Sequence, residues 1–430
     1  MEFKKITVGN FAENLDRFRI PLSSAEREKK RGKYPYYGAA KIIDYVDGFT
    51  HSGLSVLIAE DGSVETDKGY PVVQLANGEY WVNNHTHVLK GKNDWDTLYL
   101  YYALQIIKVS PFVTGAVQKK ISQKALNSME LNYFEDPMIR RKIVESLLEL
   151  DKKIELNTQI NQTLEQIAQT IFKSWFIDFD PVHAKANALA SGQTAEQATQ
   201  AAMAVISGKN TQELHRLQTA NLEQYQQLWE IAEAFPSGFD EEGVPWGWEE
   251  RELSYLFEFL SGAQPPKSEH IYEEKEGYER FIQNRDYSND NHKTYIPISK
   301  KNKRCTEKDI LMDKYGEAGK VRYGIKGAYN VALAKIVPQK DNLREFLRSY
   351  FTQDKIRNYL SSSSMASTRN SLNSTTFTRM KVIVPNDFLL STFDKLANEK
   401  IDKILQIKQE NIELSKLRDY LLPKLLSGEV

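Results

Sequence analysis

Two long stretches of the chain carry apolar residues at alternating spacings of three and four, the pattern of an amphipathic helix that packs along another helix. The first stretch covers residues 135–180 and the second covers residues 385–430. Prolines stand near the start of each stretch, as suits the first turn of a helix. We therefore predict two long helices with a coiled-coil seam. Their apolar positions are Ile139, Ile143, Leu147, Leu150, Ile154, Leu164, Ala168, Ile171 and Trp175, and then Leu389, Phe393, Leu396, Ile404, Ile407, Leu414, Leu417 and Leu421.

The two stretches repeat one pattern. Ile154 and Leu164 align with Ile404 and Leu414 at a constant offset of about 250 residues. This internal repeat predicts a mixed α+β fold in which two globular domains are separated by two long antiparallel helices, related by a pseudo-twofold axis. The predicted order is a first globule (1–134), a first long helix (135–180), a helical connector rich in Ala and Gln (181–244), a second globule (245–384) and a second long helix (385–430).

Two asparagines, Asn161 and Asn411, occupy equivalent positions near the middle of the predicted seam. A buried polar residue in an apolar seam lowers stability but penalises slipped alignments. We expect the two side chains to pair and to define the helix register. The alternative is that both are exposed on a frayed seam.

The composition predicts a soluble protein of the reducing cytoplasm. Hydrophobic residues make up 41% and charged residues 27% of the chain, and no apolar run reaches the roughly 18 residues of a membrane span. The first residues lack the apolar core of a secretion signal. A single cysteine, Cys305, excludes an internal disulfide framework and a zinc site built from cysteines. The formal net charge of −1 means that any DNA binding must come from local basic patches.

Sequence signatures of catalysis are absent. No Rossmann glycine motif, P-loop or zinc-protease motif is present. His85 and His87 have the spacing of two metal ligands on one strand face, but no third ligand is evident and polar contacts are the simpler interpretation. Glu60 and Asp61 follow an apolar strand and suit a tight turn better than half of an acidic nuclease centre.

Several stretches together resemble the DNA-specificity (S) subunits of Type I restriction-modification systems. The resemblance implies two target-recognition domains that each read half of a split DNA site, with the helices as spacer. It implies a non-catalytic chain without a cofactor, which binds double-stranded DNA, two modification subunits and restriction subunits. S-adenosylmethionine would then belong to the modification subunit, and ATP and Mg to the restriction subunit. The stretches are "KYPYYGAAKIIDYVDGFTHSGLSVLIAEDGSV", "YWVNNHTHVLKG", "IAQTIFKSWFIDFDPVHAKA", "FPSGFDEEGVPWGW" and "LRDYLLPKLLSGEV".

Basic residues interleaved with tyrosine mark candidate DNA-binding regions, because Lys and Arg contact phosphates while other side chains reach base edges. In the first globule the candidates are Lys30, Arg31, Lys33, Tyr37, Lys119, Lys120 and Gln123. In the second globule they are Lys300, Lys301, Lys303, Arg304, Arg322, Tyr323, Lys326, Arg369 and Asn370. A solvated surface is the alternative for any single lysine.

The ends of both long helices are more apolar than a seam requires. We expect each end to help seat one modification subunit, and packing of each end against the opposite globule is the alternative. The residues concerned are Phe172, Trp175 and Phe176, and Leu421, Leu422 and Leu425. Two other functions stay open from the residues alone: a coiled-coil scaffold that joins protein partners, and an enzyme with an unrecognised centre.

Overall fold

The computed structural model describes residues 2–115, 118–288, 292–365 and 371–429. The chain divides into two compact units. The first unit contains Met1–Asn157 and Gln409–Val430, and the second contains Thr158–Lys408. Each unit therefore includes part of both long helices. None of the described helices combines the length and apolar character needed to cross a membrane.

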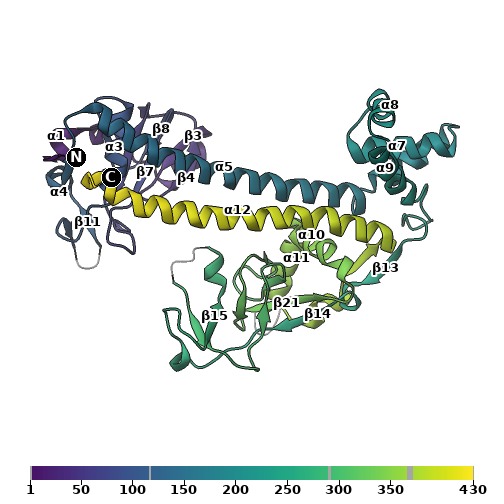
Figure 1. Cartoon of the computed structure of the whole chain (residues 1–430). Coiled ribbons are helices and arrows are strands. Elements are labelled where there is room, and N and C mark those ends of the chain that lie inside the picture. The colour runs from purple at the N-terminus through teal and green to yellow at the C-terminus, as the bar shows by residue number, and fades with distance from the viewer. Residues whose placement is uncertain (1, 116–117, 289–291, 366–370, 430) are drawn as a thin grey trace. The chain divides into compact units, whose positions relative to one another are not determined.

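The first unit is built on two small sheets and a two-stranded ribbon (Figure 1). Its core sheet has the order β2 (Glu13–Asn14), β9 (Thr86–Lys90), β6 (Ser55–Ala59) and β7 (Val73–Ala76), and α3 (Asp94–Leu104) packs on it. Its outer sheet has the order β4 (Ile42–Val46), β3 (Arg31–Tyr37), β8 (Glu79–Val82) and β5 (His51–Ser52). The ribbon pairs β1 (Lys4–Thr7) with β12 (Glu130–Tyr133). Every residue of β6 is buried, as expected for a continuous apolar run at the centre of a unit.

Short elements complete the first unit between these strands. They are α1 (Val8–Phe11), α2 (Ser24–Lys29), β10 (Val113–Thr114), β11 (Lys120–Ile121) and α4 (Gln123–Ser128).

The second unit repeats this topology. Its core sheet has the order β14 (Phe257–Ser261), β21 (Leu333–Pro338), β18 (Ile310–Asp313) and β19 (Val321–Arg322). Its outer sheet has the order β16 (Tyr295–Pro297), β15 (Tyr278–Ile282), β20 (Gly327–Tyr329) and β17 (Arg304–Cys305), and its ribbon pairs β13 (Glu249–Glu252) with β22 (Lys381–Val384). In both outer sheets one strand pair is parallel, β3 with β8 and β15 with β20. The predicted mixed fold and internal repeat are confirmed.

Helices make up the rest of the second unit. α10 (Arg344–Thr352) and α11 (Asp354–Met365) follow the core sheet. The connector forms α6 (Asp180–Ala190), α7 (Ala195–Ser207), α8 (Thr211–Ala220) and α9 (Leu222–Ala234). The predicted domain boundaries stay predictions, although β12 ends just before the first long helix begins.

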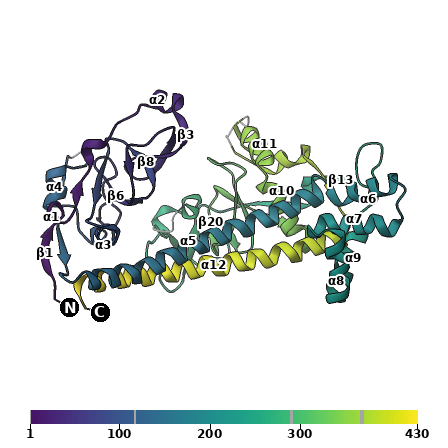
Figure 2. The ribbon, with the colours of Figure 1, turned by 90° about the horizontal axis from the view of Figure 1, so that it is seen from above.

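The long helices are α5 (Pro137–Phe176) and α12 (Asp387–Ser427), and Figures 1 and 2 show them side by side. In the first unit, Asp151 contacts Arg418 at 2.9 Å. In the second unit, the ring centroids of Phe172 and Phe393 lie 5.7 Å apart. An early residue of one helix thus meets a late residue of the other, which confirms the predicted antiparallel pair.

The predicted pairing of Asn161 with Asn411 is wrong. The Asn411 Oδ1 atom accepts a hydrogen bond of 2.8 Å from Asn157 Nδ2, and Asn411 Nδ2 donates to the Ile154 carbonyl at 3.3 Å. Asn161 is 8% exposed, and its Oδ1 atom has no hydrogen-bond donor within the described part of the chain. The helix register places the partner of Asn411 one turn earlier than the repeat alone suggests.

The aromatic end of α5 belongs to the hydrophobic core of the second unit. Phe172, Trp175 and Phe176 are at most 3% exposed. Phe176 packs edge to face on Phe393 at 5.3 Å, and Trp175 packs on Phe235 at the same distance. Side chains this deeply buried cannot offer a surface to another subunit. The expectation that these three residues seat a partner is therefore corrected, and the alternative of packing inside the chain holds.

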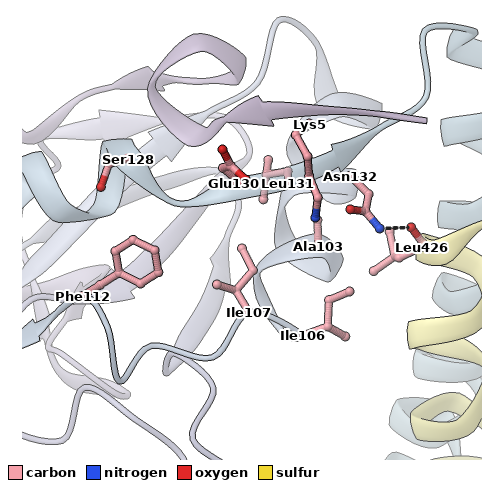
Figure 3. Close-up of a pocket in the computed structure, with 10 residues that line it drawn as sticks. All are labelled: Lys5, Ala103, Ile106, Ile107, Phe112, Ser128, Glu130, Leu131, Asn132 and Leu426. Atoms are coloured by element: carbon pink, nitrogen blue, oxygen red, sulfur yellow. Dashed lines mark hydrogen bonds between the residues drawn. The ribbon is translucent and has the colours of Figure 1, made fainter.

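The end of α12 is built into the first unit in the same way. Leu422 and Leu426 are buried in its core, and Leu421 and Leu425 are half-buried against it. Asn132 Nδ2 on β12 donates to the Leu426 carbonyl at 2.7 Å (Figure 3). A cavity of about 420 Å³ opens beside Leu426. Burial thus assigns Leu422 to the core and corrects its expected role as a partner seat. For the half-buried Leu421 and Leu425 that role stays a prediction.

Candidate nucleic-acid interface

The outer sheet of the first unit has a local irregularity in its β3–β4 pairing. The β3–β4 pairing shifts register between Arg31 and Tyr34. A Cβ atom on Gly32, at this irregularity, would lie 2.4 Å from the Val46 carbonyl oxygen, so only glycine fits. Register shifts of this kind commonly re-aim side chains at functional edges.

Apolar side chains around this sheet are unusually exposed. Ile43 and Tyr45 on β4 are 43% and 52% exposed. The ring of Phe49, itself exposed, lies 5.4 Å from that of Tyr34 on β3. Such a patch on a protein surface marks an interaction site. Phe18, Ile20 and Ile42 are exposed as well.

Basic side chains surround this apolar patch. Arg31, Lys33 and Lys41 are exposed and form no ion pair within the described residues, and the Lys33 ammonium lies 5.1 Å from the ring centre of Tyr34. Lys30 is only loosely paired, at 3.6 Å from Asp47. Of the candidates in the first globule, Lys30, Arg31 and Lys33 therefore share one surface with exposed aromatic rings.

The outer sheet of the second unit has a similar surface. Lys300, Lys301 and Lys303, in the loop between β16 and β17, are exposed and form no ion pair within the described residues. Tyr272 and Ile298, near β16, are 71% and 60% exposed.

Arg304, on β17 of the same outer sheet, is held by a carboxylate on β15. Its guanidinium donates two hydrogen bonds of 2.7 Å to the Glu279 carboxylate and a third of 2.7 Å to the Ser299 carbonyl. Direct contact with a phosphate would require Arg304 to give up this bidentate pair.

Two candidates are structural and are corrected. Tyr37 is 9% exposed and packs edge to face on Tyr80 in the core. Arg322 is 9% exposed and binds Asp313 at 2.7 Å and Glu317 at 2.8 Å. Burial and ion pairing leave neither side chain available to DNA in this arrangement.

Tyr323 and Lys326 have different surroundings although they are only three positions apart. The Tyr323 hydroxyl donates to Glu165 on α5 at 2.5 Å, and its ring lies 4.4 Å from the Lys408 ammonium on α12. Tyr323 therefore faces the long helices of the second unit. Lys326 is exposed, and no ion pair involves it within the described residues.

The remaining candidates do not join either outer-sheet surface. Lys119 is paired with Glu65, Lys120 with Glu60 at 3.0 Å, and Gln123 is exposed at the start of α4. Arg369 and Asn370 lie outside the described residues.

A buried polar cluster in the first unit has the residue types of a metal site. His87 Nδ1 lies 2.6 Å from an Asp16 carboxylate oxygen, and His87 Nε2 lies 2.8 Å from the Ile121 carbonyl. Both ring nitrogens of His87 thus lie within hydrogen-bonding distance of an oxygen atom. Arg19 contacts Asp16 at 3.4 Å and Glu60 at 2.6 Å. The Arg19 guanidinium thus pairs with both carboxylates of the cluster.

The carboxylates of this cluster are held in the charged form. Burial favours neutral Asp16, but the hydrogen bond and charge of His87 outweigh burial and lower the pKa of Asp16. Burial opposes ionisation of Glu60 in the same way, and hydrogen bonds from Arg19 and Lys120 lower its pKa. His85 lies apart, 2.8 Å from an Asp61 oxygen.

The single cysteine is buried, and its thiol is held in the neutral form. Cys305 is 5% exposed, and burial raises the pKa of its thiol to about 12.

Sequence reasoning missed most of the exposed apolar side chains of the outer sheets. The sequence predicts no role for Ile42 and Ile43, because nothing in the local pattern distinguishes them from core residues. The basic clusters next to them, at 29–33 and 300–304, were the signal that could have identified these surfaces.

Comparisons with known proteins agree with this architecture. The family model of the Type I restriction modification DNA specificity domain matches residues 1–166 and 245–418. The chain is 37% identical over 332 residues to the Type I restriction enzyme HindI specificity subunit of Haemophilus influenzae, which covers 72% of this chain and 71% of that protein. It is 26% identical over 350 residues to the Type I restriction enzyme MjaIX specificity subunit of Methanocaldococcus jannaschii, covering 77% and 68%.

A solved structure shows the same fold. The crystal structure of the S subunit of a Type I restriction-modification system from M. genitalium matches with a TM-score of 0.54 at 17% identity, over 99% of this chain and 96% of that one. The family match covers well over half of the chain. The chain belongs to the family of Type I restriction-modification DNA specificity subunits.

Proposed function

We propose that this specificity subunit reads a bipartite DNA target, with the outer sheet of each unit meeting one half of the site. The observation that carries the proposal is the repeat itself. Two sheets of the same strand order each have, beside exposed apolar side chains, lysines or arginines that form no ion pair within the described residues. Cations supply affinity for the phosphates, and the groups beside them contact base edges or stack on bases.

The predicted lysines and arginines that the fold leaves exposed fit these two roles. Lys30, Arg31 and Lys33 serve the first half-site, and Lys300, Lys301 and Lys303 serve the second. Lys326, Lys119, Lys120, Gln123, Arg369 and Asn370 are further proposed contacts. Because the formal net charge is only −1, affinity must come from these local surfaces.

The partners of this chain follow from the same function. We infer that it assembles with two modification subunits and with restriction subunits, in the cytoplasm where the DNA is. Methylation with S-adenosylmethionine would be performed by the modification subunits, and ATP and Mg would be used by the restriction subunits.

The long helices offer equivalent seats for the two modification subunits. Ile167 on α5 is 40% exposed, and Leu417 on α12 is 45% exposed. These two positions are 250 residues apart and correspond in the internal repeat. Exposed apolar side chains at matched positions suit two copies of one partner.

Exchange of one globule tests the proposal. Residues 1–134 are replaced by the corresponding globule of another specificity subunit, and the chain is assembled with its modification subunits. We expect the methylated sequence to change in one half only. A matched control replaces 245–384 and should change the other half.

Two results contradict the proposal. If either exchange alters both halves, the units do not read separate half-sites. If neither exchange alters the sequence, recognition lies outside the two globules.

A further inference from the structure

The second unit contains a cavity that the DNA-reading surfaces do not use. It has a volume of about 320 Å³ and lies between β19, α10 and the two long helices. Ligand sites in proteins begin at about 300 Å³, so the cavity is large enough for a small molecule. Its aromatic lining comes from Tyr287, Tyr323 and Phe351.

The charged lining of the cavity is predominantly basic. The acidic side chains are Glu165 and Glu345. The basic ones are Lys320, Arg322, Arg348, Arg357 and Lys408. Carboxylates already pair with four of these cations: Glu317 with Lys320, Asp313 and Glu317 with Arg322, Glu345 with Arg348, and Asp354 with Arg357. Lys408 forms no ion pair within the described residues, so it is the lining cation most open to an anion.

Arg348 has one hydrogen-bonding group without an acceptor. The residue is 4% exposed, its Nε donates to Glu345 at 2.8 Å, and its Nη2 donates to the Lys308 carbonyl at 2.6 Å. The buried Nη1 has no acceptor within the described part of the chain. A buried charged donor without an acceptor lowers the stability of the folded state. An acceptor supplied by a ligand would remove this free-energy cost.

Two further groups at the cavity lack hydrogen-bond partners among the described residues. The hydroxyl of Tyr287 is buried and bonds to nothing. The ammonium of Lys408 contacts the ring of Tyr323 at 4.4 Å, and the Arg348 guanidinium contacts the same ring at 4.7 Å. Burial lowers the pKa of Lys408, Glu165 opposes this shift, and the Arg348 charge adds to it. Lys408 is exposed and forms no ion pair within the described residues, and Glu165 is the acidic side chain whose charge acts on it.

We propose that this cavity binds a phosphate-bearing anion, with Arg348, Tyr287 and Lys408 as donors to its oxygens. Guanidinium and ammonium groups are the usual protein partners of phosphate. The phosphate has two possible sources, the DNA backbone or a free nucleotide whose base packs among the aromatic rings. The proposal is independent of how the outer sheets read sequence.

The test is calorimetric titration of the full-length chain with inorganic phosphate and with adenosine 5′-monophosphate. Lys408→Gln should weaken binding of both by about tenfold, because it removes a charged hydrogen bond. The matched control is Lys403→Gln on the same helix, whose ammonium bonds to Gln406 outside the cavity. It should leave binding unchanged.

Tyr287→Phe is a second variant that keeps the fold, since its hydroxyl has no partner to lose. It should weaken phosphate binding without lowering the thermal unfolding midpoint. The proposal is overturned if the unaltered chain shows no phosphate binding, or if Lys403→Gln weakens binding as much as Lys408→Gln.

Addition of duplex DNA shows whether the site binds a phosphate of the DNA backbone or a free nucleotide. If the duplex displaces phosphate and the nucleotide binds no better than phosphate, the site takes a backbone phosphate. If the nucleotide binds more tightly and the duplex leaves it in place, the site takes a free nucleotide. Either result supports the anion site, and neither depends on methylation.

Discussion

At the scale of single residues, the basic side chains divide into those that the fold uses and those that it leaves free. Arg322 and Arg304 have short carboxylate contacts, at 2.7 Å to Asp313 and to Glu279. Arg31 and Lys33 have no such contact within the described residues. An unpaired cation binds phosphate without first breaking an ion pair, so the free residues are the better candidates for DNA contacts.

Replacing Arg31 and Lys33 together by Ala should weaken binding of the assembled complex to all DNA sequences alike. Each lost phosphate contact lowers the slope of log affinity against log salt by about 0.9. The measurement is fluorescence anisotropy with a duplex target at several salt concentrations. Lys152→Ala, an exposed lysine on α5, is the control and should leave the slope unchanged. An unchanged slope in the double variant would place the phosphate contacts elsewhere.

The cluster of Asp16, Glu60 and His87 makes the first unit sensitive to acid. Asp16 and Glu60 have lowered pKa values in the folded chain. Their contribution to stability is therefore complete above the ordinary carboxyl pKa of about 4 and is lost as the pH falls through the lower folded values. Unfolding by urea between pH 3 and 7 should show this loss.

Asp16→Asn tests the origin of that acid sensitivity. The substitution removes a buried carboxylate that contacts His87 at 2.6 Å and Arg19 at 3.4 Å, and breaking such a buried pair should cost about 3 to 5 kcal/mol at neutral pH. It should also flatten the dependence of stability on pH below 4. The same pH slope in the variant as in the unaltered chain would assign the acid sensitivity to other carboxylates.

At the scale of elements, the long helices and the repeat could be predicted because their signals are local and periodic. Their apolar residues recur along 40 or more positions and reappear at one constant offset. The outer sheets could not be predicted, since β3 pairs in parallel with β8, more than 40 residues later, and the strands are short.

Residue roles were harder to predict than elements. Ile43 is exposed and Phe172 is buried because other segments of the chain pack on Phe172 and not on Ile43. A local sequence pattern carries no information about those segments. The same limit explains why Asn157, one helical turn before Asn161, was not predicted as the partner of Asn411.

The two exposed positions on the helices lead to a prediction about assembly. Leu417→Ser on α12 should weaken retention of one modification subunit by about tenfold, because apolar anchors commonly dominate an interface. Ile167→Ser on α5 should affect one subunit in the same way, and the double variant should affect both. Native mass spectrometry of the co-purified complex measures the stoichiometry. Full retention of both subunits in the double variant would remove these positions from the interface.

At the scale of the whole molecule, the function requires two readers that act on one duplex. α5 begins in the first unit and ends in the second, and α12 runs back from the second unit to the first. Uninterrupted helices are stiff, and two that pack together are stiffer still. We therefore expect the helix pair, and not the base contacts, to determine the spacing between the half-sites.

The spacing of the target tests this expectation directly. Each added base pair moves one half-site by about 3.4 Å and turns it by about 35° around the duplex axis. A stiff helix pair cannot follow both changes, so two added base pairs should abolish methylation while each half-site keeps its sequence. Ten added base pairs restore the rotation but not the distance, and methylation should stay absent. Methylation that tolerates either insertion would mean that the two units move independently, and that the long helices do not measure the distance between half-sites.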